Sequence, residues 1–174
     1  MSENFNLSHC IQILSHSPMV IKELLCDLDL SWTNTNEGEE SWSPSQILAH
    51  LIYGEKTDWI PRARIILNGG GVFDAFDRFA HLDMNRSVDL LLIEFEELRS
   101  VNIDTLQSWD LSPDELRLKG NHPDFGPVTL QELIATWTVH DLVHINQMTR
   151  VMAKYYKDEI GPFKNYISLL KSVD

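Results

Sequence analysis

Residues 129–156 have the sequence TLQELIATWTVHDLVHINQMTRVMAKYY, which predicts a long helix around which the rest of the chain is arranged. Thr129 followed by Glu132 has the Thr-x-x-Glu form of a capping box, which marks a helix start. The residues that then recur at intervals of three and four share one helical face: Leu133, Trp137, His140, His144, Gln147 and Val151. This face is apolar at both ends, so we expect it to point into the core.

Two histidines interrupt this apolar face. His140 and His144 are four residues apart, so their rings lie one helical turn apart and can reach the same metal ion. The same spacing also suits two core histidines that each donate a hydrogen bond to a backbone carbonyl or a carboxylate. An HxxxH pair alone is therefore a hypothesis, and a third ligand is needed to support it.

A second clear helix start lies at residues 43–46, which have the sequence SPSQ. It combines a capping serine, a proline in the first turn and a glutamine at the capping-box position. The apolar stripe that follows contains His50, and Gly54 lies one turn further on. We expect this helix to bend or break near Ile60, because Pro61 disfavours helical backbone in the residue before it.

Further helices are predicted at residues 6–28, where Pro18 should cause a kink or a division, and at residues 87–106. In the latter helix, Arg99 and the neighbouring glutamates are expected to form a solvated face. Residues 30–41 are predicted to be a loop and residues 72–86 an ordered crossover, and any strands should lie within residues 108–128. A short C-terminal helix after Gly161 should cap the bundle.

Composition sets the outer limits on the fold and on the partners. The length of 174 residues favours a single domain covering residues 1–174, with no need for disulfides. The net charge of −12 argues against binding to nucleic acid or to anionic membranes. The sequence has no long apolar span and no secretory signal, and Cys10 and Cys26 are too far apart to pair, so we expect a reduced, cytoplasmic protein.

His50 supplies the third ligand that the HxxxH pair requires. On facing helices, His50, His140 and His144 would form a tripod that leaves at least one metal position open. Structural zinc sites usually have four protein ligands, so an open site favours chemistry, and imidazoles suit zinc, nickel or iron. The weaker candidates for ligands are His9, His16 and His81. His122 precedes Pro123, which favours an extended conformation there.

Three segments resemble the DinB superfamily: WSPSQILAHL at residues 42–51, DRFAHLDMNRSVDLLLIEFEELR at residues 77–99 and HPDFGPVTLQELIATWTVHDLVHINQ at residues 122–147. This resemblance covers about residues 42–152 and implies an all-α, up-down four-helix bundle with a long crossover between the second and third helices. It also implies a metal held by His50 from the second helix and by His140 and His144 from the last long helix.

The resemblance leaves several functions open. Some members of the family transfer low-molecular-weight thiols, so a thiol S-transferase acting on a small-molecule substrate is the first expectation. The alternatives are a metal-dependent hydrolase and a non-catalytic metal-binding or stress-associated module. Gln147 and Tyr53 are candidates to position a substrate, although both also suit the core, and homodimerisation is expected by analogy with the family.

Overall fold

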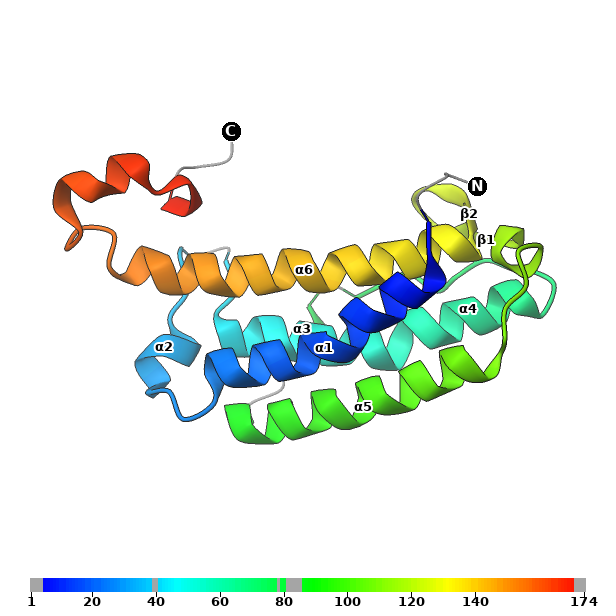
Figure 1. The fold of residues 1–174 in the computed structure, drawn as a ribbon, viewed down its shortest axis with the longest axis horizontal. Coiled ribbons are helices and arrows are strands. Elements are labelled where there is room, and N and C mark those ends of the chain that lie inside the picture. The colour runs from blue at the N-terminus through cyan, green and yellow to red at the C-terminus, as the bar shows by residue number, and fades with distance from the viewer. Residues whose placement is uncertain (1–4, 39–40, 78, 81–85, 171–174) are drawn as a thin grey trace.

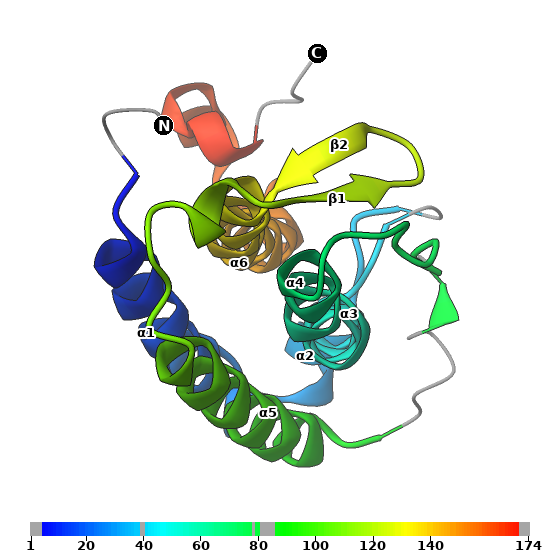
Figure 2. The same ribbon diagram turned by 90° about the vertical axis from the view of Figure 1, so that its right-hand side faces the viewer.

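Four helical segments lie side by side along the long axis of the molecule (Figures 1 and 2). The structure is a computed structural model and describes residues 5–38, 41–77, 79–80 and 86–170. The α-helices are α1 (Leu7–Leu25), α2 (Leu30–Asn34), α3 (Pro44–Thr57), α4 (Trp59–Leu67), α5 (Val88–Ser108) and α6 (Leu130–Tyr155). The other elements are the strands β1 (Lys119–His122) and β2 (Gly126–Thr129) and the 3-10 helices η2 (Glu115–Arg117), η3 (Gly161–Tyr166) and η4 (Ser168–Leu170).

The predicted all-α four-helix bundle is confirmed. Its four segments are α1, the consecutive helices α3 and α4, α5, and α6. In Figure 1, α4 ends at one end of the bundle and α5 begins at the other, so the connection between them returns along the bundle as the predicted long crossover. None of the described helices is both long enough and apolar enough to span a membrane.

The two predicted capping boxes position the helices that carry the histidines. At the start of α3, the Ser43 hydroxyl accepts from the Gln46 amide while the Gln46 side chain accepts from the Ser43 amide. Thr129 and Glu132 make the same reciprocal contacts at the start of α6. Each box satisfies backbone donors that a helix start leaves without intrahelical partners.

The predicted break in the second helical segment occurs at Asp58, between α3 and α4. Pro61 lies in the first turn of α4, where a missing backbone N–H does not interrupt the helical ladder. The break turns the first residues of α4 toward α6, and the rings of Trp59 and Trp137 stack 5.8 Å apart.

A short antiparallel hairpin closes one end of the bundle (Figure 2). Strands β1 and β2 lie where strands were expected, except that β2 extends one residue further and Val72 forms an isolated bridge with Asn121. The Phe73 ring packs so closely on Gly120 that an added Cβ would lie 2.4 Å from it, so glycine is required there. This contact and the Phe73 amide bond to the Asn121 carbonyl hold the start of the crossover against the hairpin.

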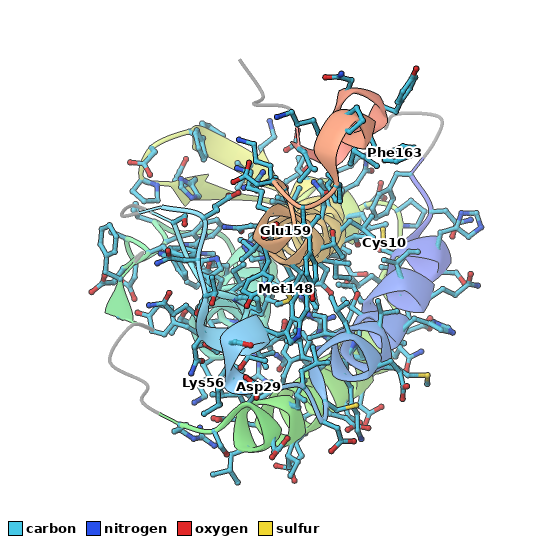
Figure 3. All side chains as sticks on the ribbon, turned by 90° about the vertical axis from the view of Figure 1, so that its left-hand side faces the viewer. Cys10, Asp29, Lys56, Met148, Glu159 and Phe163 are labelled. Carbon is cyan, nitrogen blue, oxygen red and sulfur yellow. The ribbon has the colours of Figure 1, made fainter. Side chains whose placement is uncertain are left out.

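Three local predictions were wrong in detail. The expected loop at residues 30–41 contains α2, because the Asp29 carboxylate caps the Ser31 amide at 2.8 Å and starts a helix too short to show periodicity. Of the two alternatives for Pro18, the division of the helix is wrong, since α1 continues through this residue, and the kink stays a prediction. The C-terminal segment forms the two 3-10 helices η3 and η4 in place of one helix. In η3, Phe163 (Figure 3) and Tyr166 are 69% and 88% exposed, so they do not cover the core, whereas η4 packs against α6.

Candidate metal centre

The structure brings together the three histidines that were predicted to be ligands. His50 extends from α3, and His140 and His144 extend from α6. The Nε2 atom of His140 lies 3.1 Å from the Nε2 atoms of both His50 and His144. One nitrogen from each ring can be chosen so that all three lie within 4.8 Å of one another.

The tautomer of His144 is set by a neighbouring amide. His144 Nδ1 lies 2.8 Å from Gln147 Oε1, which can only accept, so Nδ1 carries the proton and the Nε2 lone pair points into the cluster. His140 Nε2 faces two other ring nitrogens, and a single N–H could bond to only one of them. Two imidazoles that bind one zinc ion at about 2.0–2.1 Å place their nitrogens roughly 3–3.4 Å apart, so the observed spacing fits a shared cation.

Burial keeps the imidazoles of His140 and His144 neutral, as metal ligands must be. It lowers the pKa of His140 to about 3, and the nearby charges of His144 and Arg99 act in the same direction. Burial also lowers the pKa of His144, although its bond to Gln147 and the Asp141 carboxylate oppose this shift. At neutral pH, both rings on α6 therefore have a nitrogen lone pair to offer.

A buried ionic cluster lies next to the histidines, and it corrects the prediction that Arg99 is solvated. Arg99 is 2% exposed and binds both carboxylate oxygens of Asp141, at 2.6 and 3.0 Å. Its guanidinium also donates to Glu55 Oε1 at 2.8 Å and to the Leu14 carbonyl at 2.8 Å. The cluster therefore joins α5 to α6, α3 and α1.

Further donors complete the environment of the Glu55 carboxylate. Trp137 Nε1 donates to Oε1 and Asn102 Nδ2 donates to Oε2, each at 2.9 Å. Because Asp141 lies between the two histidines of α6, its bidentate contact with Arg99 fixes the rotation of the helical turn that carries them. The cluster therefore positions the turn of α6 that carries His140 and His144.

The three histidines line a cavity of about 560 Å³, a volume typical of sites for small molecules. Its described lining residues are Trp42, His50, Gly54, Asp58, Trp59, Arg62, Ala75, Phe76, His122, Asp124, Phe125, His140 and His144. A larger cavity of about 670 Å³ lies between α1 and the start of α6, and none of the three histidines lines it. The smaller cavity is the candidate site because only it combines converging ligand atoms with room for a substrate.

The other sequence candidates have different positions. His9 lines the larger cavity, His16 contacts the Gln12 carbonyl on the surface, and His81 lies outside the described residues. Tyr53 packs against Phe76 and is not among the residues that line the candidate site. Gln147 orients His144, a role that the sequence analysis did not consider.

Sequence reasoning did not identify the hairpin and α4 residues of the cavity. His122 reaches the site from β1, and its Nδ1 accepts from the Asp124 amide at 3.1 Å. Asp58 continues the stripe of His50 and Gly54 at a spacing of four residues, so helical periodicity could have found it. No local signal places His122 there, because the tertiary position of the hairpin decides its neighbours.

The lowered pKa of His140 predicts how the stability of metal-free protein depends on pH. Unfolded His140 protonates near its ordinary pKa of 6.5 and folded His140 near 3, so the unfolded state binds more protons between these values. The contribution of His140 is therefore complete above pH 6.5 and is lost as the pH falls toward 3. Relative to the His140→Asn variant, the chelated wild type should lose about 2 kcal/mol of unfolding free energy between pH 7.5 and pH 5.

Urea denaturation of both chelated proteins at the two pH values measures this difference. The comparison with His140→Asn removes the contribution of Asp58, which has the opposite sign. Burial raises the pKa of Asp58 to about 6 despite the nearby Arg62, so its contribution is complete below its ordinary pKa of 3.8 and is lost as the pH rises through 6. A stability difference that does not change with pH would contradict a neutral, buried His140.

Comparisons with known proteins show the family and the fold of this chain. The DinB superfamily matches residues 13–148 of the chain. A protein of Oceanobacillus iheyensis, named as an inferred metal-dependent hydrolase, is 23% identical over 149 residues, which cover 84% of this chain and 86% of the relative.

Two solved structures share the fold. YfiT from Bacillus subtilis, described as a probable metal-dependent hydrolase with an unusual four-helix bundle topology, superposes with a TM-score of 0.78 at 19% identity, covering 89% of this chain and 90% of YfiT. The four-helix bundle protein TT2238 gives a TM-score of 0.56 at 18% identity, covering 83% of this chain and 98% of TT2238. At these identities, the likeness establishes the fold alone.

Proposed function

This chain belongs to the DinB superfamily, and from that premise we propose that it is a metal-dependent hydrolase whose divalent ion is held by His50, His140 and His144. The observation that carries the proposal is the convergence of three imidazole nitrogens in a cavity large enough for a small substrate. The O. iheyensis relative and B. subtilis YfiT, both named as metal-dependent hydrolases, support the reaction class. Zinc, nickel and iron all suit three neutral imidazole ligands.

The cavity wall supports a diffusible nucleophile. None of the described residues that line it is serine, threonine, cysteine or lysine, so no such side chain is placed to attack a bound substrate. When bound, a divalent cation supplies Lewis acidity, which polarises a carbonyl or phosphoryl oxygen and promotes the ionisation of water. With such an ion bound, water would serve as the nucleophile, and the reaction that we propose is hydrolysis.

The residues of this chain hold and shield that centre. Gln147 keeps His144 in the tautomer that offers Nε2, and the Arg99–Asp141 contact fixes the turn between His140 and His144. The rings of Trp42 and Phe76 lie 4.8 and 5.4 Å from the His50 ring and cover it from the outside. This aromatic cover lowers the local dielectric and strengthens electrostatic interactions within the site.

Thiol transfer, the first expectation from the sequence, stays a prediction. It would use the same three histidines, because a cation with neutral ligands also favours a thiolate over a thiol. The two reactions differ in the co-substrate, so adding a thiol separates them. The names of the relatives favour water as the nucleophile.

The deciding experiment measures turnover of a panel of small esters, amides and phosphoesters, with and without a low-molecular-weight thiol. Protein reloaded with zinc, nickel or iron is compared with chelated protein and with the His144→Ala variant. We expect hydrolysis that needs metal, does not need thiol and falls at least about 100-fold in both controls. Turnover that requires thiol would favour S-transfer, and equal rates in all three proteins would mean that the centre is not catalytic.

A further inference from the structure

The cavity has a second polar group on its wall, separate from the three histidines. It is formed by Asp58, Trp59 and Arg62 at the start of α4, and all three residues are buried. Arg62 Nη2 lies 2.9 Å from Asp58 Oδ1 and donates to the Asp74 carbonyl at 3.2 Å. These contacts use one end of the guanidinium and hold it against the crossover.

The rest of the Arg62 guanidinium is not used within the chain. Arg62 is 7% exposed, and no described residue accepts a hydrogen bond from its Nε or Nη1. Neither nitrogen is among the side-chain atoms that are fully buried without a partner, so both remain accessible from the cavity that Arg62 lines. The Phe73 ring, whose centre is 5.4 Å from the guanidinium carbon, occupies another side of Arg62. The Nε and Nη1 atoms of Arg62 can therefore donate hydrogen bonds to a ligand that enters the cavity.

Trp59 adds a neutral donor to the same wall. No described residue accepts a hydrogen bond from its Nε1. The indole occupies space that Gly54 leaves open, since a Cβ at Gly54 would lie 3.3 Å from Nε1. Trp59 and Arg62 are three residues apart, so their donors lie on one face of α4.

The geometry of the second helical segment sets the distance between these donors and the histidines. His50, Gly54 and Asp58 follow one another at intervals of four, so Asp58 lies about 12 Å along the helix from His50. Gly54 between them has no side chain to divide the cavity. A small molecule can therefore have its reacting group at the histidines and a second polar group at Arg62.

We propose that Arg62 and Trp59 bind a carboxylate of the substrate, so that the enzyme acts on small organic acids whose scissile bond lies beside the three histidines. This inference rests on the proposed hydrolase function, to which it adds the substrate class. The aromatic rings of Trp42 and Phe76, which line the same cavity, suit an apolar body between the two ends of such a molecule.

The charge of this group favours a monoanion over a phosphate dianion. Arg62 supplies one positive charge, and Asp58 at 2.9 Å already offsets part of it. Because burial raises the pKa of Asp58 to about 6, its carboxyl takes up a proton readily when a second anion binds nearby. A singly charged carboxylate then forms a neutral complex with Arg62, whereas a dianion leaves an uncompensated buried charge.

The test compares phenylacetate with phenylacetamide, which have similar shape but differ in charge. Their dissociation constants are measured from the change in total tryptophan fluorescence on binding, to which Trp42 and Trp59 in the cavity wall contribute, using both zinc-loaded and chelated protein. We expect phenylacetate to bind at least tenfold more tightly than phenylacetamide in both forms, and benzylphosphonate to bind less tightly than phenylacetate. Persistence in the chelated form shows that the carboxylate is not simply a metal ligand.

The Asp58→Asn/Arg62→Gln variant removes the guanidinium without leaving a buried charge. It should bind phenylacetate at least tenfold more weakly and phenylacetamide unchanged, whereas Asp58→Asn alone should bind phenylacetate more tightly because the competing carboxylate is gone. The matched control is Asp114→Asn/Arg117→Gln, an exposed Arg–Asp pair away from this cavity, which should change neither constant.

Several outcomes would overturn the inference. One is that phenylacetate and phenylacetamide bind equally tightly. Tighter binding of phenylacetate that persists without Arg62 would also contradict it, and so would tighter binding of benzylphosphonate than of phenylacetate. If phenylacetate binds more tightly than phenylacetamide only in the zinc-loaded protein, and loss of Arg62 does not change this, the carboxylate binds the metal. If the acid preference follows Arg62 but the protein binds no metal, the substrate inference stands and the proposed hydrolase function fails.

Discussion

The variants His50→Ala, His140→Ala and His144→Ala should each lose stoichiometric metal binding and with it the metal-dependent hydrolysis. Each removes one of three nitrogens that converge within 4.8 Å, and two imidazoles cannot close the site. Loss of an outer-shell partner typically lowers metal affinity about 10–100-fold, so loss of a ligand should exceed this range. Elemental analysis after dialysis, on protein without a histidine tag, measures the metal content.

The controls separate ligand loss from general damage. His9→Ala, His16→Ala and His122→Ala should retain full metal content, because these side chains lie outside the converging cluster. The Gln147→Ala variant should bind metal about 10–100-fold more weakly than the wild type, an effect between those of the two groups, since it frees His144 to adopt the other tautomer. Full metal content in His50→Ala would contradict the three-histidine site, because His50 is the ligand that α3 contributes to it.

Replacing Arg99 with methionine should destabilise the fold by about 3–5 kcal/mol. The substitution leaves the carboxylates of Glu55 and Asp141 buried without the guanidinium that binds both of them. Burial alone would lower the pKa of Arg99, but these two carboxylates outweigh it and hold the pKa above its ordinary value. Urea denaturation of chelated protein measures the change in unfolding free energy without a contribution from bound metal.

Two further variants serve as controls: one removes an exposed arginine, and the other removes all three charges of the buried cluster. Arg86→Met removes an exposed arginine that pairs with Glu94 and should cost no more than about 1 kcal/mol. Arg99→Met combined with Glu55→Gln and Asp141→Asn should recover part of the loss, because amides are less costly to bury than unpaired carboxylates. A loss below about 1 kcal/mol in Arg99→Met would mean that water reaches the two carboxylates.

Local sequence rules were sufficient for the helices that carry the histidines. Capping contacts join residues three apart, and helical periodicity relates residues three or four apart, so both signals lie within a short stretch of chain. They placed the starts of α3 and α6 and predicted that His140 and His144 share a face. That His50 joins them, from 90 residues away, was expected from its place in the apolar stripe of a second helix and from the resemblance of three segments to one family.

The buried position of Arg99 was within reach of the same rules. Arg99 is four residues after Phe95 and three before Asn102, and both of these side chains are buried. Its charge led to the prediction of a solvated face, because arginine is almost never buried without a partner. The partners are Asp141 and Glu55, 42 and 44 residues away, and no local pattern indicates that they meet it.

The amino-acid sequence therefore determined the helices, their caps and the spacing of the histidines on α6, because these depend on neighbours within one or two turns. The tertiary structure alone decided what surrounds the histidines. Arg62 lies in the cavity wall because the chain breaks at Asp58, and His122 lies there because the β1–β2 hairpin packs against Phe73. Such contacts arise from the packing of elements far apart in the chain, where burial and shape, rather than residue spacing, select the partners.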